Sequence, residues 1–181
     1  KEHLLFITNI GKAYWVKIHE IPEAEKTSRG AHIKGLLQVG PDEEITAIVS
    51  LMNFSDDLYI FMTTSNGVVK KVRSSEFARA KTRGIIGIKL NDGDKLISAI
   101  ATKGDSDIML ISRRGKGLRF KDSSVRSMGR ASCGIKGMKL AEGDEIAAAV
   151  KVEDDTSMIL MTEKGYGKKI SFDHYSAHGR G

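Results

Sequence analysis

Residues 59–73 read YIFMTTSNGVVKKVR, and this stretch decides the fold. An apolar run ends in threonine, Asn66-Gly67 follows, and a second apolar run carries basic residues. Asn-Gly suits a type I′ turn because both residues tolerate positive φ, so the stretch predicts a β-hairpin. The same pattern occurs in LLFITNIGKAYWVKI (4–18), IMLISRRGKGLRFKD (108–122) and MILMTEKGYGKKISF (158–172).

A second motif follows each of the first three hairpins, so the whole unit repeats. It reads IKGLLQVGPDEEITAIV at 33–49, IIGIKLNDGDKLISAI at 85–100 and IKGMKLAEGDEIAAAV at 135–150. The turn glycines Gly11, Gly67, Gly115 and Gly165 are 56, 48 and 50 residues apart. A repeat of about 50 residues with four short candidate strands is typical of a propeller blade.

We therefore expect an all-β fold, a propeller-like array of four-stranded blades in one repeat domain over 1–181. The expected units are 3–57, 58–107, 108–157 and a partial fourth at 158–181. In the third unit the strands are expected at 108–112, 117–121, 135–140 and 146–152, and single turns are expected at 22–26 and 74–80. One such sheet cannot bury both faces alone, so neighbouring units must stack.

The composition excludes several classes of protein. Hydrophobic residues make up 40% and charged residues 29% of the 181 residues, which is typical of a folded globular chain. Cys133 is the single cysteine, so neither a disulfide framework nor a four-cysteine zinc site can form. The sequence contains neither a signal peptide nor an apolar run of about 18 residues. We expect a cytoplasmic protein without a membrane partner and, because the sequence begins at Lys1, a fragment of a longer chain.

Basic residues concentrate on one repeated strand. In the second strand of each hairpin, Val16, Val72, Phe120 and Ile170 share a register position, and their apolar character assigns them inward. Strand residues alternate between faces, so their neighbours should face outward. Six of these eight neighbours are cationic: Lys17, Lys71, Arg73, Arg119, Lys121 and Lys169. The turns add Lys12, Arg113, Arg114, Lys116 and Lys164.

Two interpretations of these cations remain open. Lysine and arginine commonly fill a solvated strand face and protect it from edge pairing. Because the same positions are basic in successive units, however, stacked units would form a curved cationic rim that suits a polyanion such as duplex DNA. Arg29, Arg83, Arg130 and Arg180 lie in the long linker of each unit, where they could anchor a glycine turn or contact a phosphate.

The stretches NGVVKKV (66–72), RFKDSSVRSMG (119–129), GIKGMKLAEGDE (134–145) and KGYGKK (164–169) resemble the C-terminal domain of the DNA gyrase A protein. This resemblance implies a β-pinwheel, in which neighbouring blades exchange a strand. It also implies a basic perimeter that binds and bends double-stranded DNA without reading its sequence. The implied perimeter contacts are Lys70, Lys71, Arg73, Arg113, Arg114, Lys116, Arg119, Lys121, Lys168 and Lys169, beside Lys12 and Lys17.

The resemblance further implies a role in ATP-dependent negative supercoiling. The partners would be the gyrase B protein and the gyrase A core in a heterotetramer, with ATP and magnesium bound elsewhere. The isolated domain would be monomeric and, in a bacterium, associated with the nucleoid. Gyrase A proteins carry a basic box of the form QRRGGKG, and no such string occurs here. The corresponding domain of topoisomerase IV is similar and remains an alternative, as does a propeller-like scaffold that binds an acidic protein.

We expect neither a catalytic site nor a metal site or cofactor in this domain. Tyr14, Tyr59, Tyr166 and Tyr175 have no acid–base constellation beside them, and the five histidines form no HExxH motif. The stretch from Asn91 to Asp94 begins like a calcium loop but lacks the rest of that motif, so it is interpreted as a turn.

Overall fold

The computed structural model describes residues 2–181 as strands joined by turns and short 3₁₀ helices. The strands are β1 (His3–Thr8), β2 (Lys12–Lys17), β3 (Ile45–Leu51), β4 (Tyr59–Thr64), β5 (Val68–Arg73), β6 (Ile85–Ile86), β7 (Leu96–Thr102), β8 (Asp107–Ser112), β9 (Gly117–Lys121), β10 (Ile135–Lys136), β11 (Ile146–Val152), β12 (Ser157–Met161) and β13 (Gly167–Ser171). The 3₁₀ helices are η1 (Ile18–Glu20), η2 (Ile33–Gly35), η3 (Ser74–Phe77), η4 (Lys81–Arg83), η5 (Asp122–Ser124) and η6 (Phe172–His174). None of the helices in residues 2–181 has the length and apolar character needed to cross a membrane.

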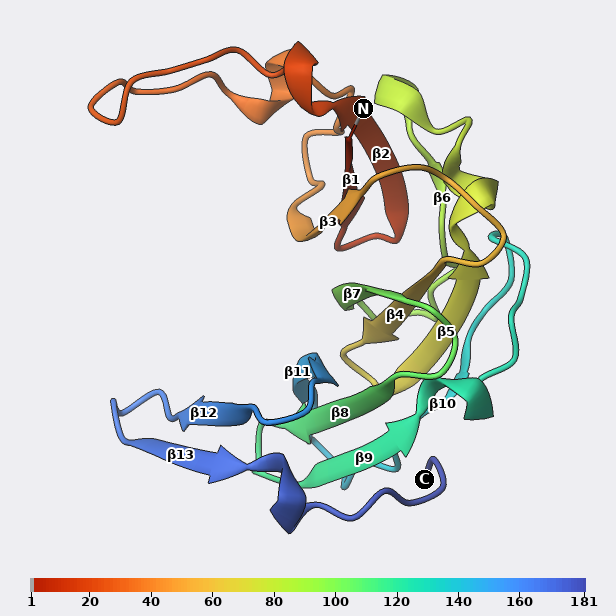
Figure 1. Ribbon diagram of the computed structural model, residues 1–181, viewed down its shortest axis with the longest axis vertical. Coiled ribbons are helices and arrows are strands. Elements are labelled where there is room, and N and C mark those ends of the chain that lie inside the picture. Colours follow the sequence, from red (N-terminus) through yellow and green to blue (C-terminus); the bar gives the residue numbers. More distant parts are fainter. Residues whose placement is uncertain (1) are drawn as a thin grey trace.

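The strands form successive small sheets along an arc (Figure 1). Their orders are β3-β1-β2-β6, β7-β4-β5-β10, β11-β8-β9 and β12-β13. In each of the first three sheets the last strand of the unit, β3, β7 or β11, is innermost, and β7 packs beside both β3 and β11. The strands β6 and β10 lie on the convex side of the arc (Figure 1). The all-β, blade-like prediction is therefore confirmed.

Neighbouring units exchange a strand. β6 belongs to the second unit but pairs with β2 of the first, with Ala13 opposite Ile85. β10 belongs to the third unit and pairs in the same way with β5 of the second, with Val69 opposite Ile135. The strand exchange that the family resemblance implies is thus present at both of these junctions.

A glycine carbonyl at each of the first two hairpin turns receives an exchanged segment. The amide of Gly67 donates to Thr64 O at 3.1 Å, and the Thr64 hydroxyl accepts from the amide of Val68 at 3.2 Å. The carbonyl of Gly67 then accepts from the amides of Gly137 and Met138, at 2.8 and 3.2 Å. Gly11 receives the corresponding segment of the second unit with the same two distances. The turn therefore closes the hairpin and also positions the following unit.

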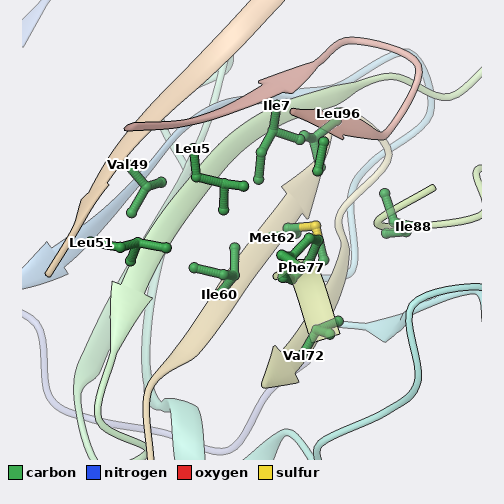
Figure 2. Packing of buried hydrophobic residues seen from close by; sticks show 11 residues of the cluster. Leu5, Ile7, Val49, Leu51, Ile60, Met62, Val72, Phe77, Ile88 and Leu96 are labelled. Atoms are coloured by element: carbon green, nitrogen blue, oxygen red, sulfur yellow. The ribbon is translucent and has the colours of Figure 1, made fainter. Parts of the chain in front are cut away.

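The core lies between the sheets of successive units (Figure 2). Leu5 and Ile7 of the first unit pack with Ile60 and Met62 of the second. A second cluster joins Phe61 and Val69 of the second unit to the third, where Ile108, Leu110 and Phe120 are fully buried. Because successive sheets bury their facing sides against one another, the predicted stacking of units is confirmed.

The structure differs from the sequence prediction in the third strand and in the first linker. β10 covers 135–136 and not 135–140, because the following amides leave the sheet to reach Gly67. Residues 22–26 form no 3₁₀ helix, whereas η3 occupies the start of the predicted turn at 74–80. In the first unit the matching segment forms η2, and Leu37 beyond it is buried against Phe6 and Tyr14.

The turn glycines offer a test of this junction. Gly67 has φ +79°, and a Cβ there would lie 2.7 Å from the carbonyl oxygen of Met138, so Gly67→Ala adds a backbone clash to a strained φ. Gly165 has φ +82° with nothing within 4 Å, so Gly165→Ala adds only the left-handed strain of about 1 kcal/mol. We expect Gly67→Ala to cost about 3 kcal/mol, which lowers the melting temperature by about 6–12 °C, against about 2–4 °C for the control.

Circular dichroism melts of the two variants measure this difference. Equal losses of melting temperature would contradict the assigned contact between the Gly67 turn and the exchanged segment.

Candidate nucleic-acid interface

The outer edge of the arc carries cations without acids. In the second and third units it consists of the linker after the second strand and the exchanged segment that follows the linker. Residues 77–90 and 123–141 contain neither aspartate nor glutamate, and residues 174–181 continue the pattern. The linkers that precede β6 and β10 lie on the convex side of the arc in Figure 1, as do those two strands. The positive potential of these segments is therefore not offset by acidic side chains of their own.

Eight exposed cations on these segments are named the outer-edge cations. They are Arg79, Lys81, Arg83, Lys89, Arg126, Lys136, Lys139 and Arg180. Lys89 and Lys139 occupy the same position in successive units, 50 residues apart. Of these eight cations, only Arg83 and Arg180 are among the possible contacts predicted from the sequence, and the other six are not. The lack of acids in these segments is the signal that could have identified the others.

The densest group of outer-edge cations surrounds a surface hollow. Residues 78–83 line it, and its volume is about 490 Å³. Arg79, Lys81 and Arg83 are all exposed, and no side-chain hydrogen bond or ion pair joins them to any of the residues described. Lys81 has φ +43°, a left-handed conformation that strains a residue with a side chain. Three unpaired positive groups around one hollow form a local site for an anion.

The prediction that Lys70 and Lys71 are exposed contacts is wrong. Their exposed fractions are 0% and 6%. The Lys70 Nζ donates to Gly87 O at 3.0 Å, to Ser132 O at 2.8 Å and to Arg130 O. The Lys71 Nζ donates to Asp122 O at 2.8 Å and lies 5.2 Å from the centroid of the Tyr59 ring. Both ammonium groups hold the third unit against the second, and for Lys71 the face predicted to be solvated is covered by the next linker.

Arg119 also faces a neighbouring unit and not open solvent, which corrects its predicted outward orientation. Its side chain is 19% exposed, and its Nη2 lies 2.6 Å from the Asp107 carboxylate. Its Nη1 donates to Phe172 O at 3.2 Å in the fourth unit. The guanidinium is therefore neutralised and hydrogen-bonded within the protein.

Several predicted hairpin cations are partly neutralised. Lys12 pairs with Glu43 at 2.7 Å, and Arg113 approaches Glu163 at 3.2 Å and Glu145 at 3.7 Å. Lys121 lies 3.6 Å from Asp107 and 3.9 Å from Asp105, and the Lys116 Nζ donates to Lys139 O. Among the predicted hairpin contacts, those with no side-chain partner in residues 2–181 are Lys17, Arg73, Arg114, Lys168 and Lys169. Of these, Lys17 is half-buried and the other four are exposed.

The linker arginines divide between the two interpretations. Arg130 is half-buried, and its Nη1 donates to Ile86 O at 3.0 Å. The Arg180 Nη1 donates to the equivalent Lys136 O at 3.1 Å, and its Nε donates to Ser124 O. These two arginines anchor the linker of one unit to the exchanged segment of the previous one. Arg29 and Arg83 are exposed and make no such contact with the part of the chain described.

Acidic and phenolic side chains serve the turns. Asp94 accepts from the Ser65 hydroxyl at 2.9 Å and from the amide of Asn66 at 3.0 Å, as expected for a turn residue. Burial tends to raise the pKa of the equivalent Asp144, but hydrogen bonds from Ser112 and from two backbone amides outweigh it and lower that pKa. The Tyr14 hydroxyl donates to Glu43 at 2.7 Å, and its burial raises the Tyr14 pKa.

In residues 2–181 no three His, Cys, Asp or Glu side chains gather as a metal site.

A family model described as "DNA gyrase C-terminal domain, beta-propeller" matches residues 2–52, 58–103, 106–153 and 156–181. The DNA gyrase A protein of Treponema pallidum (strain Nichols) is 53% identical over 131 residues, which cover 72% of this chain and 16% of the relative. A solved DNA topoisomerase IV C-terminal domain superposes with a TM-score of 0.89 at 29% identity, covering 99% of this chain and 56% of that one. A solved DNA gyrase A C-terminal domain gives 0.85 at 32%, covering 99% and 58%.

The buried Lys70 predicts a measurable pH dependence. Burial lowers the pKa of Lys70 to about 8, below its ordinary value of 10.5. Between these values the unfolded chain binds a proton that the folded chain has released, so the free energy of unfolding rises with pH. We expect the unfolding free energy of the wild type, relative to that of Lys70→Met, to rise by up to about 3 kcal/mol between pH 8 and pH 10.5. Urea titrations of both proteins across this range measure the difference, and a constant difference would contradict the low pKa.

Proposed function

The chain belongs to the family of DNA gyrase A C-terminal domains, and on that premise we propose that its outer edge binds double-stranded DNA along the sugar-phosphate backbone and bends it. The supporting observation is the repetition of acid-free, cation-bearing linkers and exchanged segments on the same edge of successive units. The proposed contacts are the outer-edge cations other than Arg180, whose guanidinium is bonded to protein carbonyls, together with Arg29, Arg73 and Arg114.

The electrostatic match favours a long track over a single pocket. Duplex DNA carries one negative charge per ~1.7 Å, so contacts with successive units add along its length. Lysine and arginine contacts to phosphate fix the position of the duplex but carry no base information. Any sequence preference should therefore follow how readily the duplex bends along the arc.

Predicted cations whose side chains already bind protein groups contribute less to the proposed DNA contact, or nothing. Lys70, Lys71 and Arg119 are excluded as direct contacts, because their donors are occupied by protein acceptors away from solvent. Lys12, Arg113 and Lys121 would have to leave a carboxylate to reach a phosphate, and Lys116 would have to leave a carbonyl. Lys168 and Lys169 lie on the exposed last hairpin and are retained as possible DNA contacts. Lys17, which is half-buried, is a secondary candidate for such a contact.

The chain spans 16% of its gyrase A relative, so the activity of the whole protein is a separate proposal. We propose that a DNA segment bent along this domain is delivered to the cleavage core and so supports negative supercoiling. The gyrase B protein would supply ATP hydrolysis with magnesium in a heterotetramer within the bacterial cytoplasm, at the nucleoid. The domain itself would bind no cofactor and contribute no catalytic residue, and as an isolated domain it would be monomeric.

The dependence of affinity on duplex length tests this function. A bending surface should gain affinity as the duplex grows from about 15 to about 40 base pairs, because further phosphate contacts become available. Fluorescence anisotropy with labelled duplexes measures the gain at fixed salt. A flat response, together with tighter binding of an acidic polypeptide such as polyglutamate, would favour the scaffold alternative.

The assignment of the edge is tested by a pair of double variants. Lys89→Gln with Lys139→Gln removes two exposed outer-edge charges and should weaken binding of a 40-base-pair duplex by about tenfold at low salt. The slope of log affinity against log salt should fall by about 1.8, since two phosphate contacts are lost. Lys103→Gln with Lys151→Gln is the matched control, because it removes the same charge from the inner strands and the loop after them. Equal effects of the two pairs would contradict the outer-edge assignment.

A further inference from the structure

One register position joins consecutive units by a side-chain donor. It lies four residues after the hairpin glycine and is occupied by Trp15, Lys71 and Arg119. The Trp15 Nε1 donates to Phe77 O and Ala78 O, both at 3.2 Å. Lys71 donates to Asp122 O, and Arg119 to Phe172 O and, at 3.5 Å, Tyr175 O. We name Trp15, Lys71 and Arg119 the inter-unit donors.

The acceptors lie in corresponding turns although the donors differ in chemistry. Each carbonyl belongs to the 3₁₀ turn after the second strand of the following unit, or to the residue next to that turn: η3 for Trp15, η5 for Lys71 and η6 for Arg119. An indole, an ammonium and a guanidinium share only an N–H group at the end of a long side chain. The repeated contact, and not a repeated residue type, is therefore the common feature of the position.

These turns are the origin of the cation-bearing linkers. The linker that carries Arg79, Lys81 and Arg83 starts at η3, and the linker that carries Arg126 starts at η5. Backbone contacts continue the attachment, since the amide of Met128 donates to Lys71 O at 2.9 Å and that of His178 donates to Arg119 O at 2.8 Å. Each inter-unit donor thus fixes where the outer-edge cations of one unit begin relative to the sheet before it.

We propose that the inter-unit donors are positioning residues that set the angle between consecutive units, and through it the curvature that the outer edge imposes on DNA. The inference rests on the proposed function. Bending a duplex costs free energy that the protein–DNA contacts must offset. If the contact between two units (the joint) gave way, the duplex would straighten and move away from the next unit. Loss of a donor should therefore weaken contacts that span a joint and leave contacts within one unit unchanged.

The test compares a duplex that crosses joints with one that stays within a unit. The probes are a 40-base-pair duplex and a hairpin duplex of about 10 base pairs, roughly 34 Å long. For Lys71→Met we expect about fivefold weaker binding of the long duplex, a smaller bend by energy transfer between its ends, and less than about twofold change for the short one. Lys71→Arg keeps a donor and should restore both readouts, and Lys103→Gln controls for the lost charge.

Trp15→Phe is the second variant, because it removes one N–H donor and keeps an aromatic ring beside His3 and Phe54. It should reproduce the length-selective loss even if Lys71→Met fails to fold. Equal losses for both duplexes, or wild-type bending by both variants, would overturn the inference while the proposed function stands. A wild-type chain that gains no affinity with length would instead overturn the proposed function, and this inference with it.

Discussion

The structure depends on the hydrogen bonds between an exchanged segment and the hairpin glycine of the preceding unit. The Gly67 carbonyl accepts from two amides of the third unit, and Gly11 accepts in the same way from the second. Further on, the amide of Leu96 donates to Asn9 O and that of Ile146 to Ser65 O, which fixes the start of β7 and of β11 on the sheet before it. The linker must cross the outer edge to reach the glycine carbonyl, so the same constraint that joins the units also places these linkers on the convex side of the arc.

Positive charge on this fold serves two separate purposes. Lys70, Lys71 and Arg119 direct donors to carbonyls of the next unit, where burial makes an unmade hydrogen bond costly, and Arg119 also pairs with Asp107 of its own sheet. Most cations of the linkers and exchanged segments keep their donors in solvent. The net charge of +6 reflects neither purpose, because acidic residues elsewhere offset most of the positive charge. Contacts between units therefore use one set of basic residues, and the proposed polyanion contacts use another.

The sequence could predict what depends on local chemistry. The glycine turns, their Thr or Ser partners and the strands of the third unit, observed at 107–112, 117–121 and 146–152, follow from spacing and turn preferences. Alternation also predicts which face Lys71 occupies, but it cannot show that the next linker covers that face. Lys70 shares the face of Val72 by the same alternation, so its burial agrees with the pattern and contradicts only the resemblance. Arg79, Lys81 and Arg126 lie in irregular linkers, where no periodicity applies.

Lysine acetylation footprinting tests the central claim most directly, namely that DNA lies along the outer edge. The chain is labelled with and without a 40-base-pair duplex, and each lysine is quantified by mass spectrometry. The account predicts protection of Lys81, Lys89, Lys136 and Lys139, no change at Lys103 and Lys151, and low reactivity of Lys70 and Lys71 in both states. Protection centred on Lys103 and Lys151, with the outer-edge lysines still reactive, would contradict it.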